Sequence, residues 1–214
     1  MLEIADALAT VLKHAKPLKT EVAALTTAAI GQVLAVDIAA DIDSPPFAKS
    51  LRDGYAVRAA DCVHGHTHTE LKVIEEVPAG KVPTKPVGPG EATRIFTGAP
   101  IPEGADAVVM QEHTTRGDGV VQVTDQSVKP GRHIYPRGTE MQAGGVVLKA
   151  GTPINPAAYG VLASVGKTAV PAFPFPRVGI IVTGDEVVEA NTLPKLGQIR
   201  NSNGPMLAAQ TVRG

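Results

Sequence analysis

Four polar segments of the sequence hold the residues best suited to chemistry. They are residues 50–57, residues 94–112, residues 137–140, and a fourth segment that joins residues 183–186 to residues 198–203. Their carboxylates can hold a metal ion or orient water, whereas their arginines, hydroxyls and glycine amides can bind an oxyanion. These residue types favour a site for an anionic substrate or a metal, but taken alone they define no reaction.

Each segment, considered singly, also has a purely structural interpretation. Asp53-Gly54 is a favoured turn pair, and Arg137 with Glu140 could form a solvent-exposed ion pair that contributes little to stability. Ser202 or Asn203 could cap a following helix. Short motifs often match by chance, so the structural interpretation is the better one for any single segment.

Hydrophobic spacing predicts the elements that must position these segments. Apolar residues recur at helical spacing over residues 4–15, and Pro17 ends that helix. Over residues 34–42 they alternate with polar residues, which predicts a strand. Other elements are expected where apolar runs lie between turn residues: strands at 71–77, 107–110 and 120–123, and a helix at 156–164.

The change of pattern along the chain predicts a mixed α+β, multi-domain fold. The 22 glycines and 18 prolines suit many short strands and tight turns. We expect residues 1–52 and 130–176 to form an elongated helical and β linker domain, and residues 53–129 to form a β-rich lobe. Residues 177–214 should be the incomplete start of an α/β domain with a parallel sheet.

The last of these regions begins with an apolar run at 178–182, which is typical of a strand buried on both faces of a parallel sheet. Residues 183–186, which include Asp185 and Glu186, follow directly, and binding residues collect at the carboxyl ends of such strands. Only 38 residues remain from Arg177 onward, whereas fewer than ~40 residues rarely support a core of their own. We therefore expect the tail beyond about Pro176 to be poorly packed or to rest on a neighbouring molecule.

Composition and charge exclude several classes of function. A formal net charge of -1 creates no global field for nucleic acid or an anionic membrane. No apolar run approaches the ~20 residues that span a bilayer, and the N-terminus lacks the pattern of a signal peptide. The single Cys62 excludes an internal disulfide framework. We expect a cytoplasmic protein with no nucleic-acid partner and no membrane partner.

A second candidate metal site lies outside the four segments. Cys62, His64, His66 and His68 alternate, so on a strand they would share one face. Cysteine and histidine are good zinc ligands. However, alternate residues of one strand rarely surround an ion tetrahedrally, and the intervening glycine and threonines favour an exposed loop. The loop is the preferred interpretation.

Taken together and in this order, the four segments resemble the molybdopterin molybdenumtransferase family, which includes the second half of gephyrin. The resemblance runs through Ser-Leu-Arg-Asp-Gly-Tyr-Ala-Val at 50–57 and Arg-Ile-Phe-Thr-Gly-Ala-Pro at 94–100, and continues to Glu112. It covers essentially the whole chain. Segment 94–112 is long enough to be highly specific, whereas the other segments would be weak alone.

The resemblance implies an enzyme that inserts molybdenum into adenylylated molybdopterin and releases AMP during molybdenum cofactor biosynthesis. The substrates would be molybdate and adenylylated molybdopterin, and the cofactor would be Mg²⁺, since attack on a phosphoanhydride is usually helped by a divalent ion. A homodimer with each site completed across its interface is also implied, with molybdopterin adenylyltransferase as a further partner.

The resemblance also implies roles for individual residues. Asp53 and Glu112 would orient substrate groups or water, and Glu186 would handle a metal ion or water. Thr97 would donate to an oxyanion together with the backbone of Gly98. The implied catalytic residues are Asp53, Thr97, Glu112 and Glu186, and the implied substrate-binding residues are Gly98, Arg137, Asp185, Ser202 and Asn203; Glu186 is the implied metal ligand.

The sequence departs from the family pattern in places. Leu51-Arg52 replaces a small residue and a methionine, and Glu140 stands where the family has aspartate. The later Gly-Gly-Val-Ser and Pro-Gly-x-Pro segments of the family do not occur in these 214 residues. The chain could be a fragment, which we favour, one half of a split enzyme, or a truncated protein. The alternative functions are a non-catalytic binding or scaffold module and a hydrolase that acts on another nucleotide.

Overall fold

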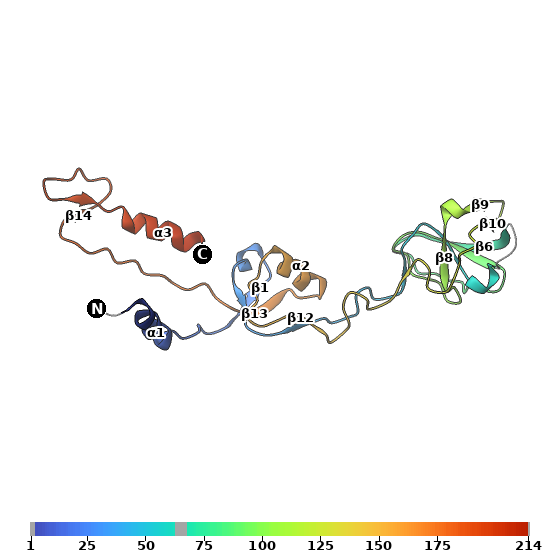
Figure 1. Ribbon diagram of the computed structural model, residues 1–214, viewed down its shortest axis with the longest axis horizontal. Coiled ribbons are helices and arrows are strands. Elements are labelled where there is room, and N and C mark those ends of the chain that lie inside the picture. Colours follow the sequence, from blue (N-terminus) through green and yellow to red (C-terminus); the bar gives the residue numbers. More distant parts are fainter. Residues whose placement is uncertain (1–2, 63–67, 214) are drawn as a thin grey trace.

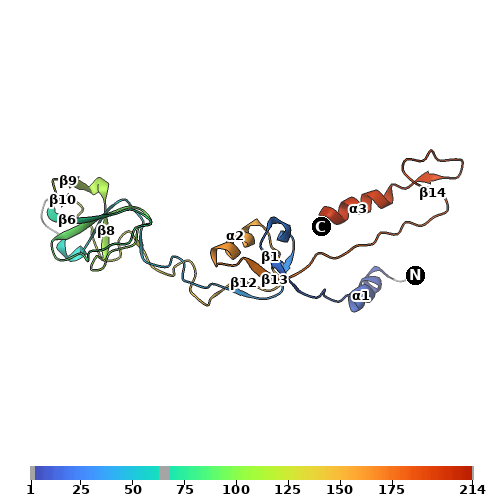
Figure 2. The same cartoon turned by 180° about the vertical axis from the view of Figure 1, so that it is seen from behind.

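The chain folds into an elongated molecule in which structured regions follow one another (Figure 1). The computed structural model describes residues 3–62 and 68–213. A β lobe lies at one end, and a small region around β1 (Glu21–Ala24), β13 (Ala169–Phe173) and α2 (Pro156–Ser164) lies in the middle. The two chain termini lie toward the other end. The view from behind shows the same separation (Figure 2). The predicted mixed α+β fold is confirmed, and the chain crosses twice between the middle region and the lobe.

The β lobe is built on a six-stranded mixed sheet with the order β8-β5-β7-β6-β10-β9. Strands β6 and β7 run parallel, and the other neighbours in this sheet are antiparallel. A single 3-10 turn, η3 (Gln111–His113), joins the edge strand β8 to the other edge strand β9, so the sheet curls. The strands are β5 (Gly54–Val57), β6 (Thr69–Val77), β7 (Glu91–Ile95), β8 (Ala107–Met110), β9 (Thr114–Arg116) and β10 (Val120–Val123).

Both faces of the lobe's sheet are packed. Tyr55 and Val57 on β5 lie in a cluster that includes Leu71 and Val121, whereas the intervening Ala56 packs in a second cluster. This alternation follows from the two-residue period of a strand. The strands expected at 71–77, 107–110 and 120–123 are confirmed as β6, β8 and β10. The 3-10 turn η2 (Ala59–Asp61) follows β5 along the chain.

The middle region has its own core. Strands β1 (Glu21–Ala24), β13 (Ala169–Phe173) and β2 (Val33–Leu34) form an antiparallel sheet of three strands. Helix α2 (Pro156–Ser164) covers the core with Leu162, which is fully buried beside Leu34 and Ile154. The Asn155 side chain caps α2 by accepting a hydrogen bond from the Ala158 N–H at 2.8 Å. The helix expected at 156–164 is therefore confirmed.

The continuous strand expected at 34–42 is wrong. Its residues form the end of β2 and a separate short strand, β3 (Ile38–Ala39), with Val36 and Ile42 exposed. The reason is a change of partner, because β2 pairs with β13 whereas β3 pairs with β12 (Val146–Leu148). The chain then reaches the lobe through β4 (Lys49–Ser50), which pairs with β11 (Ile134–Tyr135) on the return path. A 3-10 turn, η1 (Thr27–Ala29), lies between β1 and β2.

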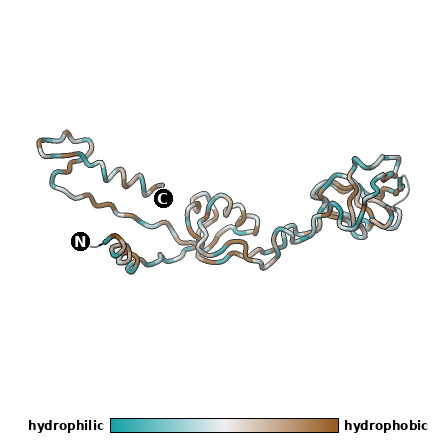
Figure 3. Tube along the Cα trace, viewed as in Figure 1, coloured by the Kyte–Doolittle hydropathy of each residue, from teal (hydrophilic) through white to brown (hydrophobic). Residues whose placement is uncertain are grey.

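The predicted N-terminal helix is confirmed as α1 (Ile4–His14), but none of its residues is buried. Its apolar side, which includes Leu8 and Leu12, is open to solvent in this single chain. Figure 3 shows apolar residues along α1 and along the extended C-terminal segment. Within the described residues, no helix is long and apolar enough to cross a membrane.

The strand expected at 178–182 is also wrong. These residues have no regular structure, and Ile181 is 88% exposed. A buried parallel strand needs neighbours on both sides, whereas the parallel pairing in this region joins only β14 (Val187–Val188) to β15 (Ile199–Arg200). Helix α3 (Asn203–Arg213) follows. None of the side chains described over residues 177–212 is buried, as expected for a poorly packed tail.

Candidate functional site

The structure joins two of the expected site residues directly. Asp53 precedes β5 and Thr97 follows β7, and the two strands pair in antiparallel register with Gly54 opposite Ile95. One carboxylate oxygen of Asp53 accepts hydrogen bonds from the Thr97 N–H at 2.8 Å and from the Thr97 hydroxyl at 2.7 Å. Both residues are exposed, so the pair lies at a solvent-accessible edge of the lobe.

These hydrogen bonds set the charge of the carboxylate. The Thr97 N–H and then its hydroxyl lower the pKa of Asp53, and the positive charge of Arg94 acts in the same direction. Asp53 is therefore ionised at neutral pH. Its second carboxylate oxygen makes no hydrogen bond with the described residues, so it remains available to a ligand or to water.

The backbone around Asp53 is held closely. A side chain at Gly54 would place its Cβ 1.8 Å from the Val109 carbonyl oxygen, so only glycine lets β5 approach β8 at this point. The Asp53 carbonyl accepts a hydrogen bond from the Gln111 N–H at 3.0 Å. Glu112 is the next residue along η3, and its side chain is exposed. Asp53 and Glu112 are thus near one another in the fold, although 59 positions separate them in the sequence.

The N–H groups expected to bind an oxyanion are engaged within the protein. Gly98, at φ +86°, donates its N–H to the Ser50 carbonyl at 2.9 Å. Thr97 directs both of its donors to Asp53. An oxyanion could bind Thr97 only in competition with the Asp53 carboxylate, because both acceptors need the same two hydrogens.

Sequence reasoning did not single out Arg94, which connects this edge of the lobe to its core. Its guanidinium donates to the Tyr55 hydroxyl at 3.1 Å and to the Gln111 side-chain oxygen at 2.8 Å. It also lies over the rings of Tyr55 and Phe96, at 5.0 and 5.3 Å from their centroids. The available signal was the alternation of Arg94 and Phe96 along one strand, which puts both side chains on one face.

Arg137 and Glu140 lie in the turn and bend that follow β11 on the return path to the middle region, and they do not pair with each other. Arg137 forms an ion pair with Asp43 at 2.5 Å, and the Ala143 N–H and then Arg137 lower the pKa of Asp43. Glu140 accepts a hydrogen bond from the Ser44 hydroxyl at 2.7 Å. The Arg137–Glu140 ion pair, which was the structural alternative for this segment, is not formed, because Asp43 lies at the guanidinium instead.

The remaining expected site residues lie far from Asp53. Asp185, Glu186, Ser202 and Asn203 are in the C-terminal segment around β14 and α3, at the opposite end of the molecule from the β lobe (Figures 1 and 2). All four are exposed. The side-chain oxygen of Asn201, rather than of Ser202 or Asn203, accepts a hydrogen bond from the N–H of Gly204 in the first turn of α3.

No group of three or more histidine, cysteine, aspartate or glutamate side chains that could hold a metal ion occurs within residues 3–62 and 68–213. Asp185 and Glu186 alone would offer two carboxylates. His64 and His66 of the alternating cluster lie outside the described residues. Cys62 is 3% exposed, and burial, with nearby carboxylates, raises the pKa of its thiol to about 11.

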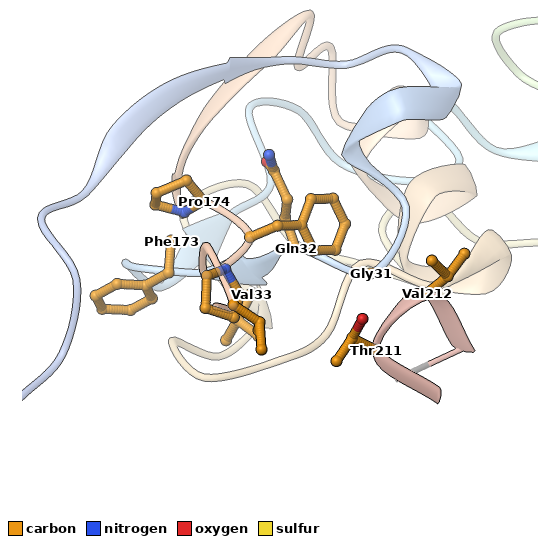
Figure 4. A pocket seen from close by; sticks show the side chains of 10 residues that line it. Gly31, Gln32, Val33, Phe173, Pro174, Thr211 and Val212 are labelled. Carbon is orange, nitrogen blue, oxygen red and sulfur yellow. The ribbon is translucent and has the colours of Figure 1, made fainter. Parts of the chain in front are cut away.

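An apolar pocket of about 430 Å³ lies where α3 approaches the middle region (Figure 4). Phe173 and Pro174 line one part, and Thr211 and Val212 of α3 line another. None of its lining residues is charged. The pocket therefore lacks the cationic groups that an oxyanion substrate would need.

Comparison with known proteins agrees with this architecture. Residues 2–166 match the family described as the MoeA N-terminal region (domain I and II). The molybdopterin molybdenumtransferase of Staphylococcus aureus (strain Mu50) is 44% identical over 182 residues, which cover 84% of this chain and 43% of that protein. The corresponding protein of Staphylococcus epidermidis is 42% identical over the same length and with the same coverage. The chain thus spans less than half the length of these curated relatives.

Solved structures show the same similarity. A crystal structure of a molybdopterin biosynthesis moeA protein from Pyrococcus horikoshii OT3 superposes with a TM-score of 0.91 at 38% identity, and covers all of this chain and 57% of that one. A second structure of a molybdopterin biosynthesis moeA protein from the same organism gives a TM-score of 0.85 at 33% identity, over 99% of this chain and 54% of that one.

Proposed function

Because the chain belongs to the MoeA N-terminal region family, we propose that it takes part in inserting molybdenum into adenylylated molybdopterin, with release of AMP, during molybdenum cofactor biosynthesis. The observation that carries this proposal is the Asp53–Thr97 pair. It holds an ionised carboxylate with one unengaged oxygen at an exposed edge of the lobe, inside the segment that the family model matches.

The proposed chemistry uses that carboxylate as an orienting group. An ionised Asp53 can accept a hydrogen bond from an attacking water or from a substrate hydroxyl, and the two bonds from Thr97 keep it from rotating. Glu112, on the neighbouring turn, is the second candidate for this task. We assign Gly98 and Arg137 to substrate binding, Gly98 by shaping the turn after Thr97 rather than by donating its own N–H.

The second half of the proposed site lies in the C-terminal segment. Asp185, Ser202 and Asn203 would contact substrate, and Glu186 would handle water or a metal ion. Mg²⁺ is commonly bound through one or two carboxylates together with substrate phosphates. The described residues bring no third ligand to Asp185 and Glu186, so no step is assigned to the ion here.

The distance between the two halves supports a homodimer as the working form. Asp53 directly precedes β5 of the lobe and Glu186 directly precedes β14, and these two regions lie at opposite ends of the molecule (Figures 1 and 2). A second chain would bring a Glu186 to each Asp53. The exposed apolar side of α1 offers surface for such an association, since soluble proteins rarely leave large apolar patches uncovered. We extend the proposal to a cytoplasmic setting and to molybdopterin adenylyltransferase as the protein that delivers the substrate.

The test is AMP release from adenylylated molybdopterin in the presence of molybdate and Mg²⁺. The 214-residue chain is assayed alone, and also within a chimera in which it replaces the matching segment of the S. aureus relative. We expect activity in the chimera and a loss of at least tenfold for Asp53→Asn, since this change removes the charge while keeping an acceptor for Thr97. Arg177→Gln, an exposed change outside the site, is the matched control.

Three results would contradict the proposal. An inactive chimera that folds normally would favour a non-catalytic binding or scaffold role. Full activity in Asp53→Asn would remove the carboxylate from the mechanism. Cleavage of ATP in place of adenylylated molybdopterin would identify the protein as a hydrolase for another nucleotide.

A further inference from the structure

A polar pocket of about 320 Å³ lies in the β lobe, and neither Asp53 nor Thr97 is among the residues that line it. Tyr55 and Arg94, which are directly opposite each other on β5 and β7, form one side. Glu76 is opposite Arg94 on the parallel strand β6. The turn between β9 and β10 forms the other side, with the residues Arg116, Gly117, Asp118 and Gly119.

The guanidinium of Arg94 is held in place but is not saturated. An arginine side chain has five N–H donors, and Arg94 uses two of them, toward Tyr55 and Gln111. The buried Nε has no hydrogen-bond partner among the described residues. Stacking against Tyr55 and Phe96 fixes the plane of the group. Each Nη atom therefore keeps a second N–H, in a fixed plane, for a ligand in the pocket, whereas the buried and unpaired Nε is a donor whose desolvation costs free energy.

The other charges of the pocket are also unengaged. Arg116, Glu76 and Asp118 are exposed, and none of them forms an ion pair within 4.0 Å in the described part of the chain. Two cations and two carboxylates thus line one small pocket, and none of the ion pairs within 4.0 Å in the described part of the chain involves them. The volume is at the lower end of the range typical of small-ligand pockets, which often lie at the mouths of curled sheets.

We propose that this pocket binds a nucleoside monophosphate of the AMP type. The two arginines would hold the phosphate, since guanidinium groups match its oxygens in charge and geometry. The carboxylates of Glu76 and Asp118 would accept hydrogen bonds from an exocyclic amino group of the base. Inorganic phosphate could engage the two arginines, but it would offer no amino group to the carboxylates of Glu76 and Asp118. The choice of AMP rests on the proposed function, in which AMP is the product.

Binding is measured by calorimetry on the whole 214-residue chain, with AMP, IMP, adenosine and inorganic phosphate as probes. IMP keeps the phosphate but replaces the amino group with a carbonyl, so it tests the carboxylate side alone. We expect AMP to bind more tightly than IMP, adenosine or phosphate, each by about tenfold, the factor expected from one charge-assisted contact. Amide shifts of Gly117 and Gly119 in the NMR spectrum should locate the nucleotide at this turn.

Two variants and one control complete the test. Arg116→Gln and Asp118→Asn lie in an exposed turn and should fold normally, and each should weaken AMP binding about tenfold. Asp118→Asn should also reduce the preference for AMP over IMP. Arg177→Gln is the matched control, and it should leave the affinity unchanged.

Several outcomes would overturn the proposal. They are no AMP binding at millimolar concentration, equal binding of IMP and AMP, or AMP affinity that is insensitive to Arg116 and Asp118. Failure here is distinguishable from failure of the proposed function. An active chimera whose AMP affinity ignores both variants refutes the pocket alone, whereas specific AMP binding by an inactive chimera refutes the reaction alone.

Discussion

Replacing Gly54 with alanine should destabilise the β lobe and disturb the Asp53–Thr97 pair. The new Cβ would lie 1.8 Å from the Val109 carbonyl oxygen, 2.8 Å from the carbonyl carbon and 3.1 Å from the Gln111 nitrogen. Real Cβ atoms do not approach closer than 3.0 Å, so one strand must move by more than 1 Å. The clashing atoms belong to the backbone, so no side-chain rotation can relieve the contact.

The magnitude follows from what holds β8 in place. Val108 and Val109 are fully buried on opposite faces of the sheet, so β8 cannot retreat without disturbing both clusters of the lobe. Overpacking a close-packed core typically costs about 1–3 kcal/mol. We expect the upper end, about 3 kcal/mol, because the contact is so short and involves backbone. This corresponds to roughly a hundredfold change in the unfolding equilibrium.

Native-state hydrogen exchange is the suitable assay, because the lobe and the middle region have separate cores. Amides of β5, β7 and β8 should lose protection in Gly54→Ala, while those of α2 and β13 should not. Gly160→Ala is the matched control, because Gly160 is an exposed residue within α2 and nothing lies within 4 Å of the new Cβ. That change should stabilise the middle region by about 0.5–1 kcal/mol, because alanine is the better helix former.

Unchanged protection of β5 and β8 in Gly54→Ala would refute this reasoning, since it would mean that β8 yields at no cost. Equal destabilisation by both alanine substitutions would refute it as well. It would show that the effect comes from losing glycine rather than from the contact with Val109.

Three further predictions follow from hydrogen bonding, burial and packing. Thr97→Val removes the hydroxyl donor to Asp53 but keeps the N–H, so the Asp53 pKa should rise toward its ordinary value in an NMR titration. Because the Asp53 pKa is lowered in the folded state, the ionised Asp53 stabilises the fold at pH values above the ordinary pKa of 3.8. This stabilisation is lost as pH falls through the lowered pKa, so the free energies of unfolding of wild type and Thr97→Val should converge in acid. The Cys62 thiol, with a pKa raised to about 11, should resist alkylation at pH 8 until the lobe unfolds. The protonated thiol contributes fully to stability below the ordinary pKa of 9.0, and this contribution is lost as pH rises toward 11. Melting curves of wild type and Cys62→Ala, recorded over this pH range, would show the loss. Leu162→Ala should cost about 2–5 kcal/mol and reduce exchange protection in the middle region alone, and an equal loss in the β lobe would refute the proposed division into separate domains.

Several elements could be predicted from the sequence because their signals are local. Strand β8 and helix α2 begin and end where the apolar runs and the helix-entry proline place them. The 34–42 region misled the same reasoning, because its alternation continues through a point where the chain changes pairing partner. The apolar run at 178–182 misled it because a buried parallel strand depends on neighbours that hydrophobicity alone does not supply.

In the candidate site, too, the sequence identified residues but not the contacts between them. Asp53, Thr97 and Glu112 could be identified because they lie in segments that match the family pattern. Their positions in the sequence do not show that Asp53 accepts hydrogen bonds from both the N–H and the hydroxyl of Thr97. Arg94 escaped attention because its importance lies in contacts across the sheet, with Tyr55 on β5 and Gln111 on η3.

The sequence by itself determined the family, the mixed α+β class and those local elements whose pairing partner does not change, because spacing along a chain encodes helical and strand periods directly. Only the tertiary structure decided which polar groups meet. Strand register brought Asp53 to Thr97 and Arg94 to Tyr55, and it put Glu76 across from Arg94 in a second polar pocket. The path of the extended C-terminal segment places β14, which Glu186 directly precedes, at the other end of the molecule (Figure 1). Such proximities depend on pairing between residues tens of positions apart, which no local pattern specifies.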